Sequence, residues 1–432
     1  MRFTIQIKRR KQNEVLVLIV LAITLCFGFF LDLLQMPGVI KYTVDIFWLL
    51  LLATIVLARF RMPNNEAAQL LKLVIVFWLV TLIGWMLNAV NPLYYLWGFR
   101  NNFRFPVYFF SCAMFLREDT GSELLQLFDK LFYLNFAVTL IQFFILGKRM
   151  DYLGGIFGDE VGCNGKTLVF FSIILTKSIL GYMEGTESTK TCLVKCGIAL
   201  AIAAMAELKF FFFVFAFIVI MSALITKTTR KKFVVIAASG IGIYFSIILL
   251  INIFPQWAGF FSFEKMLESA TSSKGYTGRG DMNRLTTIPI TWKRFLTDWP
   301  KRLFGLGLGN CDTSAFSFLN TPFYQRYGYL RYNWFSSSFL FLETGVAGMV
   351  TYLSFFVALF FYTRRRERTG EGRKEWCQMA QILAPVCFML FVFNGSLRME
   401  EAYWLYFVLA LPFINMPVCS GKGGEVGAQI AC

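Results

Sequence analysis

Residues 271–285 read T-S-S-K-G-Y-T-G-R-G-D-M-N-R-L and open a long polar stretch that extends to residue 348 in an otherwise apolar chain. Within this stretch, F-G-L-G-L-G-N occupies 304–310 and W-F-S-S-S-F-L-F-L-E-T-G-V-A-G occupies 334–348, where it continues into a hydrophobic segment. We expect this stretch to form the working surface of the protein. The remaining segments would then hold it against a membrane.

The composition predicts a polytopic membrane protein. Apolar residues make up 57% of the 432 residues, aromatic residues 18% and charged residues only 16%, and the mean hydropathy is +0.59. These values are too apolar for a water-soluble domain of this length. The net charge of +16 comes from short clusters between apolar runs, which indicates topology-setting charge and no nucleic-acid partner.

The residue types also limit the chemistry. The chain contains no histidine, and its cysteines form no C-x-x-C pair. Histidine bases, histidine metal ligands and zinc hydrolysis are therefore excluded. We expect neither a metal nor a cofactor.

A spanning helix needs about twenty apolar residues, and the sequence offers about twelve such stretches. The expected spans are 15–31, 39–57, 71–90, 105–116, 124–146, 167–182, 192–205, 210–225, 233–254, 334–362, 377–393 and 403–416. Basic clusters at 2–11, 59–61, 227–232 and 364–374 are predicted to be cytoplasmic, which puts both termini inside and the polar stretch outside. The expected organisation is an N-terminal bundle (1–254), a large extracytoplasmic loop (255–333), and C-terminal helices with a cytoplasmic tail (334–432).

Within the loop, residues 282–299 have the pattern of an amphipathic helix lying in the membrane interface. Its apolar residues recur at spacings of three or four: Leu285, Ile288, Trp292, Phe295 and Trp299. We expect Pro289 to kink this helix and Pro300 to end it. The glycine run at 305–309 lacks the lysine of a nucleotide-binding loop, which favours a flexible return turn.

Arginine accumulates on the predicted outer face, against the positive-inside trend. The residues concerned are Arg100, Arg104, Arg279, Arg284, Arg294, Arg302, Arg326, Arg331 and Arg398. Any single one is equally consistent with snorkelling to lipid headgroups. As a group they favour a substrate that carries phosphates, because guanidinium groups match phosphate oxygens bidentately.

Carboxylates are fewer on the same face: Asp151, Asp159, Glu160, Glu207, Asp281, Asp298, Glu343, Glu400 and Glu401. Glu343 lies inside an apolar span, where an ionised side chain costs roughly 2.5 kcal/mol or more unless it is paired. A hydrogen bond to a neighbouring helix or loop is the structural alternative for Glu343. Glu207 and Lys209, in A-E-L-K between two spans, have the spacing of a charge pair, with a role in the site as the second interpretation.

Together, N-R-L-T-T-I-P-I-T-W (283–292), F-G-L-G-L-G-N and S-S-S-F-L-F-L-E-T-G-V-A-G resemble segments of the O-antigen polymerase and ligase superfamily, the Wzy-type polysaccharide polymerases. L-G-G-I-F-G (153–158) and A-E-L-K (206–209) are similar to segments of capsule and exopolysaccharide polymerases. The implied fold is all-α and polytopic, with about twelve transmembrane helices and one large extracytoplasmic loop that contains amphipathic helices. The implied location is the bacterial cytoplasmic membrane.

The resemblance implies a metal-independent glycosyltransferase that polymerises undecaprenyl-diphosphate-linked repeat units, with arginines holding the diphosphate. Arg284 matches the loop arginine of the family, with Arg279 as its nearest competitor and Glu343 as the third catalytic candidate. The substrate-binding candidates are Arg100, Arg104, Asp159, Glu207, Lys209, Arg294 and Arg398. Membrane lipid, a flippase and a chain-length regulator are the other implied partners.

The chain departs from the ligases of this superfamily, which place a histidine shortly before E-x-G. Here that position is Trp334 or Phe335, which favours a polymerase over an O-antigen ligase. A general base would be Glu343, Asp159 or Glu207, unless positioning and leaving-group stabilisation suffice. The alternatives are a transporter or flippase of lipid-linked oligosaccharides and a non-catalytic membrane scaffold.

Overall fold

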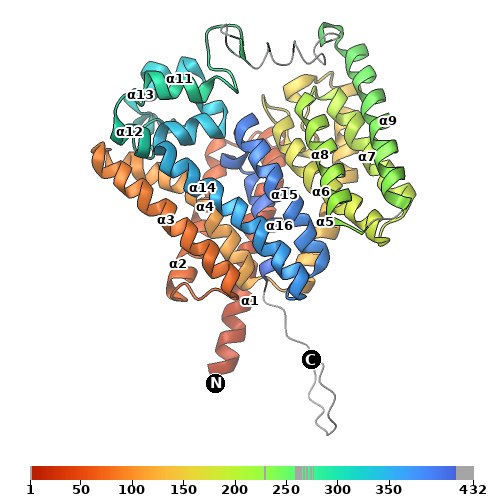
Figure 1. The fold of residues 1–432 in the computed structure, drawn as a ribbon, viewed down its shortest axis with the longest axis horizontal. Coiled ribbons are helices and arrows are strands. Elements are labelled where there is room, and N and C mark those ends of the chain that lie inside the picture. Colours follow the sequence, from red (N-terminus) through yellow and green to blue (C-terminus); the bar gives the residue numbers. More distant parts are fainter. Residues whose placement is uncertain are drawn as a thin grey trace.

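The computed structural model describes residues 2–227, 230–257 and 277–414, together with residues 265, 268, 271, 272 and 275. Over this part of the chain the structure is helical, without any strand. Figure 1 shows a bundle with the short helices α11 (Thr287–Arg294), α12 (Trp299–Phe304) and α13 (Pro322–Tyr327) at one end. We call this the loop end. Helix α1 (Arg2–Gly28) starts at the opposite end.

A helix overlaps each of the stretches predicted to span a membrane. After α1 these helices are α2 (Thr43–Leu57), α3 (Asn65–Leu87), α4 (Pro92–Phe115), α5 (Glu118–Leu140), α6 (Asn164–Glu184), α7 (Thr189–Met205), α8 (Lys209–Ile225), α9 (Arg230–Ile253), α14 (Ser336–Thr369), α15 (Lys374–Phe393) and α16 (Ala402–Ala410). In the described part of the chain, eight of them are long and apolar enough to cross a membrane: α1, α2, α3, α5, α6, α9, α14 and α15. These helices indicate a membrane-embedded protein.

The segment predicted as one amphipathic helix over 282–299 is shorter and interrupted. Only residues 287–294 form α11, and the chain then turns into α12 at Trp299. Pro289 and Pro300 both lie in the first turn of a helix, where the missing N–H takes no intrahelical hydrogen bond away. The predicted kink at Pro289 and the predicted end at Pro300 are therefore wrong. Asp298 caps α12 by accepting from the backbone N–H of Lys301.

Helices from both halves of the chain share one large core. Helix α14 packs against α3 and α15, α16 against α4, and α15 against α6. Tyr403, Trp404 and Tyr406 of α16 are almost completely buried, so the last described helix lies in the middle of the bundle. A second, smaller core lies at the loop end and includes Cys311 and Tyr332 of the loop with Phe339 and Leu342 of α14.

Helix α14 is broken at Gly345, whose φ of 63° and ψ of −161° lie outside the helical region. The break frees backbone carbonyls, and the glycine run fills their hydrogen bonds. Leu306 N–H donates to the Leu342 carbonyl at 2.9 Å, and Gly307 N–H donates to the Glu343 carbonyl at 3.0 Å. Gly305, Gly307 and Gly309 all have positive φ. The run is thus a packed turn that fastens the loop to α14, and not the flexible turn we expected.

Candidate functional site

Five side chains from three distant segments form a continuous polar chain at the loop end, which we call the arginine network. Its members are Arg100, Asn101 and Arg104 of α4, Asp312 after the glycine run, and Arg398 between α15 and α16. Arg100 Nη1 donates to Asn101 Oδ1 at 2.6 Å, and Asn101 Nδ2 donates to Asp312 Oδ2 at 2.7 Å. Arg398 Nη2 donates to the same oxygen at 3.3 Å, and Arg104 Nη2 donates to the Arg398 carbonyl at 2.9 Å.

Helix α4 positions two of these arginines four residues apart, so that they lie on the same face. Arg100 is already satisfied, since its Nε donates to both carboxylate oxygens of Asp45 at 2.9 and 3.0 Å. Its guanidinium also lies 5.0 Å from the ring centroid of Trp97. Arg100 therefore fastens α4 to α2, and of the pair only Arg104 keeps unfilled guanidinium donors.

Arg104 is buried with unfilled hydrogen-bonding capacity. Its side chain is 3% exposed, and its Nε and Nη1 have no hydrogen-bond partner among the described residues. The nearest carboxylate is that of Glu400, at 3.7 Å from Nη1. Arg398 Nε is unpartnered in the same way. Buried donors without partners cost free energy, so these nitrogens need an explanation.

Two buried carboxylates beside the network also carry an unpartnered oxygen. Glu343 is completely buried, and its Oε1 accepts from the backbone N–H of Cys311 at 3.0 Å while Oε2 has no partner in the described structure. Glu401 is 4% exposed, and its Oε2 likewise has none. Both groups can accept a hydrogen bond or a proton.

The two adjacent glutamates of the last loop differ in their electrostatics. Burial raises the pKa of Glu401 to about 7, although the charge of Lys166 acts in the opposite direction. For Glu400, burial alone would raise the pKa, but the charges of Arg104, Lys166 and Lys41 outweigh it and lower the pKa. Glu400 is therefore the counter-ion of Arg104, whereas Glu401 can exchange a proton near neutral pH.

Arg284 belongs to a second group. Its Nε donates to the Phe393 carbonyl at 3.1 Å, and its guanidinium lies 4.0 Å from the centroid of the Phe393 ring. Lys209 lies close enough for the charge of Arg284 to act on it, and it pairs with Glu207 at 2.9 Å. The predicted Glu207–Lys209 pair is therefore present. Phe393 immediately precedes the loop that carries Arg398, Glu400 and Glu401, so this loop connects the two groups.

The other predicted site residues lie apart from the network. Asp159 pairs with Lys148 at 2.6 Å. Arg294 is exposed and donates to the Tyr329 hydroxyl at 3.2 Å. Arg279 is exposed in a bend of the loop. No contact joins these three to the arginine network in the described part of the structure.

Sequence reasoning did not select Asn101, Asp312 and Glu401 for the site. Asp312 follows the glycine run, and Asn101 stands between two arginines in an aromatic helix, so each had a local signal. The contact between Asn101 and Asp312 depends on tertiary packing.

The described residues contain no group of three or more aspartate, glutamate or cysteine side chains that could hold a metal ion.

No protein-family model matches the chain, and a search of curated proteins finds no match to it either.

Proposed function

We propose that the protein is an extracytoplasmic glycosyltransferase that polymerises undecaprenyl-diphosphate-linked repeat units into a capsule, exopolysaccharide or O-antigen chain. One observation supports it most: Arg104 Nε and Nη1, Arg398 Nε, Glu343 Oε2 and Glu401 Oε2 are all buried at the loop end without a described partner. Unpartnered guanidinium donors suit diphosphate oxygens, and unpartnered carboxylate oxygens suit a hydroxyl.

In this proposal the acceptor hydroxyl oxygen bonds to the anomeric carbon of the donor glycan. The bond from that carbon to the diphosphate oxygen breaks, and the lipid diphosphate leaves. Arg104 and Arg398 stabilise the charge of the leaving group, which is the larger catalytic contribution. The hydroxyl proton goes to Glu401, whose pKa of about 7 suits a general base, or to Glu343. Arg284 binds the second lipid-linked substrate.

The proposal includes a topology. The twelve helices that overlap the predicted spans would cross a bacterial cytoplasmic membrane, with the loop end outside and both termini in the cytoplasm. The basic clusters support this orientation, because cytoplasmic segments carry the excess of lysine and arginine. A flippase that delivers repeat units and a chain-length regulator are the proposed partners.

A flippase is the second candidate, and the break in α14 at Gly345 favours it. Transporters often place their sites at discontinuous helices whose freed backbone groups contact substrate. Here the freed Leu342 and Glu343 carbonyls already accept from Leu306 and Gly307. Because those groups are occupied by the chain itself, the polymerase explains the site better.

The test compares glycan length in a deletion strain that expresses wild type, Arg104→Gln, Arg284→Ala or the control Arg326→Ala. Arg326 is exposed in the same loop and outside the network. We expect wild type and the control to restore the long ladder, and each site variant to reduce long chains by at least about tenfold at equal protein level.

The location of unpolymerised units separates the candidates. Single repeats on the outer leaflet of the variant strains support the polymerase. Repeats held on the inner leaflet would contradict the polymerase and support the flippase. Long chains at wild-type levels in Arg104→Gln would show that the arginine network is not part of the site.

A further inference from the structure

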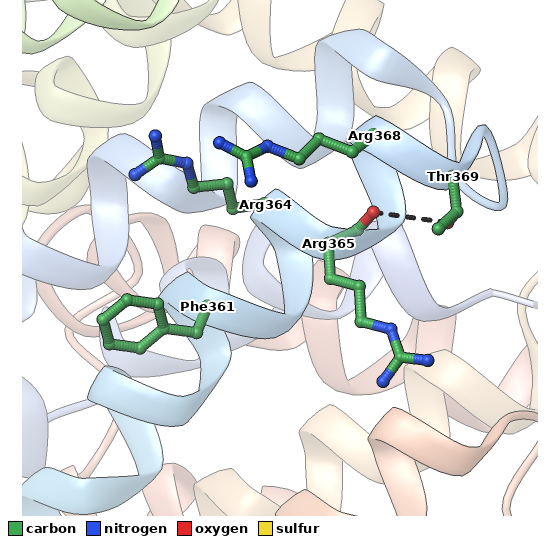
Figure 2. A pocket seen from close by; sticks show the side chains of 5 residues that line it. All are labelled: Phe361, Arg364, Arg365, Arg368 and Thr369. Carbon is green, nitrogen blue, oxygen red and sulfur yellow. Dashed lines mark hydrogen bonds between the residues drawn. The ribbon is translucent and has the colours of Figure 1, made fainter.

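A groove lies at the other end of α14, far from the arginine network. It consists of two adjoining cavities of about 490 and 600 Å³ that share Arg364 and Arg368. Phe361 and Arg365 line the first, and Met221, Leu224 and Ile225 at the end of α8 line the second. We call this the α14 groove (Figure 2).

An exposed face of α14 leads into the groove. Val350, Val357 and Phe361 are 57%, 44% and 59% exposed, and Arg364 and Arg368 follow on the same face. The spacings of seven, four, three and four residues keep all five in one line along the helix. The face is therefore apolar for about three turns and cationic at its end.

The basic cluster of α14 contains arginines with different roles. Arg366 is buried, and it pairs with Glu66 at 3.3 Å and donates to the Pro412 carbonyl at 2.9 Å. By contrast, Arg364 and Arg368 are exposed, and neither side chain makes a hydrogen bond or ion pair with any described residue. Figure 2 shows their guanidinium groups turned to the same side, with Arg365 pointing away.

The wall of the groove contains one carboxylate, which offsets only part of the charge of the two arginines. Glu367 lines the second cavity and places one negative charge against the two arginines, and its oxygens accept from Gln378 at 2.8 Å and from Gln381 at 2.7 Å. Leu224 of the facing helix is 74% exposed, so the opposite wall is apolar. The groove therefore combines two exposed guanidinium groups, which one carboxylate only partly offsets, with apolar surfaces on α8 and α14.

We propose that the α14 groove binds an anionic phospholipid, with the phosphate between Arg364 and Arg368 and an acyl chain along Phe361, Val357 and Val350. Two arginines four residues apart can hold phosphate oxygens from one side. Basic pockets between helices at a membrane face are suited to anionic headgroups. An alternative role for the two arginines is to interact with the free carbonyls at the C-terminal end of α14. That role would explain their charge, but it would not explain the apolar strip that leads to them.

The experiment titrates the purified full-length protein with phosphatidylglycerol, with phosphatidylcholine of the same acyl chains, and with glycerol phosphate, and counts bound molecules by native mass spectrometry. The variants are Arg364→Gln/Arg368→Gln and the charge-keeping Arg364→Lys/Arg368→Lys. The control Arg59→Gln/Arg61→Gln removes the same charge from two other exposed arginines.

We expect wild type and the control to bind phosphatidylglycerol about tenfold more tightly than the glutamine variant, with the lysine variant between them. Equal binding by the glutamine variant, or equal binding of phosphatidylcholine by wild type, would overturn the proposal. Binding of glycerol phosphate as tight as that of the lipid would make this a soluble-anion site. The expected result does not depend on the proposed enzymatic activity, since no glycan is involved.

Discussion

Arg104 and Arg366 are both buried arginines on apolar helices, yet their surroundings differ. Arg366 has an ion pair with Glu66 and hydrogen bonds to the carbonyls of Pro412 and Glu371. Arg104 has one hydrogen bond, from Nη2 to the Arg398 carbonyl, and a long contact to Glu400, while its Nε and Nη1 have no hydrogen-bond partner in the described structure. Burial of a charge is tolerated when it is paired, so Arg366 stabilises the fold and Arg104 remains available for a ligand.

This difference predicts opposite phenotypes for the two substitutions. Arg366→Gln leaves Glu66 buried with only a long contact of 3.9 Å to the exposed Arg365, which costs on the order of 3 kcal/mol of folding free energy. Arg104→Gln removes a 3.7 Å contact to Glu400 and one hydrogen bond together with two unpartnered donors, so it should cost less. Under the proposed function it should also reduce long chains by at least about tenfold. Thermal unfolding of the purified proteins measures the first effect. A larger fall in Tm for Arg104→Gln than for Arg366→Gln would contradict the assignment, and Glu66→Gln should recover part of the loss in Arg366→Gln.

Glu401 predicts a pH-dependent stability. Its pKa is raised from 4.5 to about 7 in the folded protein, so the folded state binds the proton more tightly than the unfolded state. The resulting stabilisation is complete below pH 4.5 and is lost as the pH rises through about 7. Wild type should therefore lose on the order of 3 kcal/mol relative to Glu401→Gln between pH 4.5 and pH 8.

The measurement is Tm against pH in detergent for both proteins, with Glu160→Gln as a control at an exposed position of a neighbouring loop. Parallel curves for wild type and Glu401→Gln would mean that Glu401 has an ordinary acidity in the folded protein.

At the level of elements, the break in α14 is the feature that joins the loop to the bundle. Gly345 has a backbone conformation that is essentially restricted to glycine. A Cβ there would lie 2.6 Å from the backbone carbonyl carbon and oxygen of Leu303 at the end of α12. The sequence E-T-G places a glycine at this position, but an apolar run does not indicate a break in a helix. The break exists because the backbone of another segment packs into it.

Gly345→Ala should therefore lower the free energy of unfolding by about 3 kcal/mol or more, since strain and backbone contact add together. Gly197→Ala in α7 is the matched control, because a Cβ at Gly197 meets nothing within 4 Å. The control should be neutral or slightly stabilising in a helix. Equal Tm values for the two variants would show that the break can straighten without cost.

The same reasoning explains the errors at Pro289 and Pro300. Periodicity over 282–299 indicated one amphipathic helix, because apolar residues recur at helical spacing across the whole segment. The capping carboxylate of Asp298 starts a new helix instead. A proline in a first turn and a proline that ends a helix look alike in sequence, and only the position of the cap separates them.

At the scale of the whole molecule, hydrophobicity was sufficient to locate the long helices but not their neighbours. Each predicted span overlaps a helix, because runs of apolar residues have few other structures available in a membrane. The site is different: Arg104 and Arg398 are separated by 294 positions in the chain. Their contact arises from α16 lying at the centre of the bundle, and no local pattern encodes that arrangement.

The proposed topology predicts one-sided labelling by a membrane-impermeant maleimide. Phe318 is 66% exposed at the loop end, so Phe318→Cys should react in intact cells. Lys190 is exposed in the first turn of α7, at the end of the bundle where Glu184 pairs with Lys374. Lys190→Cys should react only after permeabilisation. The reverse labelling pattern would show that the protein has the opposite orientation in the membrane.

The background for this labelling replaces Cys26, Cys419 and Cys432 by serine. Cys26 is exposed, whereas the other cysteines of the described chain are buried. The triple serine variant without further changes should remain unlabelled on both sides.

The packing of the glycine run against α14 limits the routes by which a ligand can reach the loop end. Lifting the 305–309 turn away would uncover the Leu342 and Glu343 carbonyls and open the small core that Phe339 and Leu342 share with the loop. Opening the turn would therefore cost free energy, because backbone carbonyls would lose their hydrogen bonds. Under the proposed function, a lipid-anchored glycan would therefore have to reach the arginine network between helices, from within the plane of the bilayer.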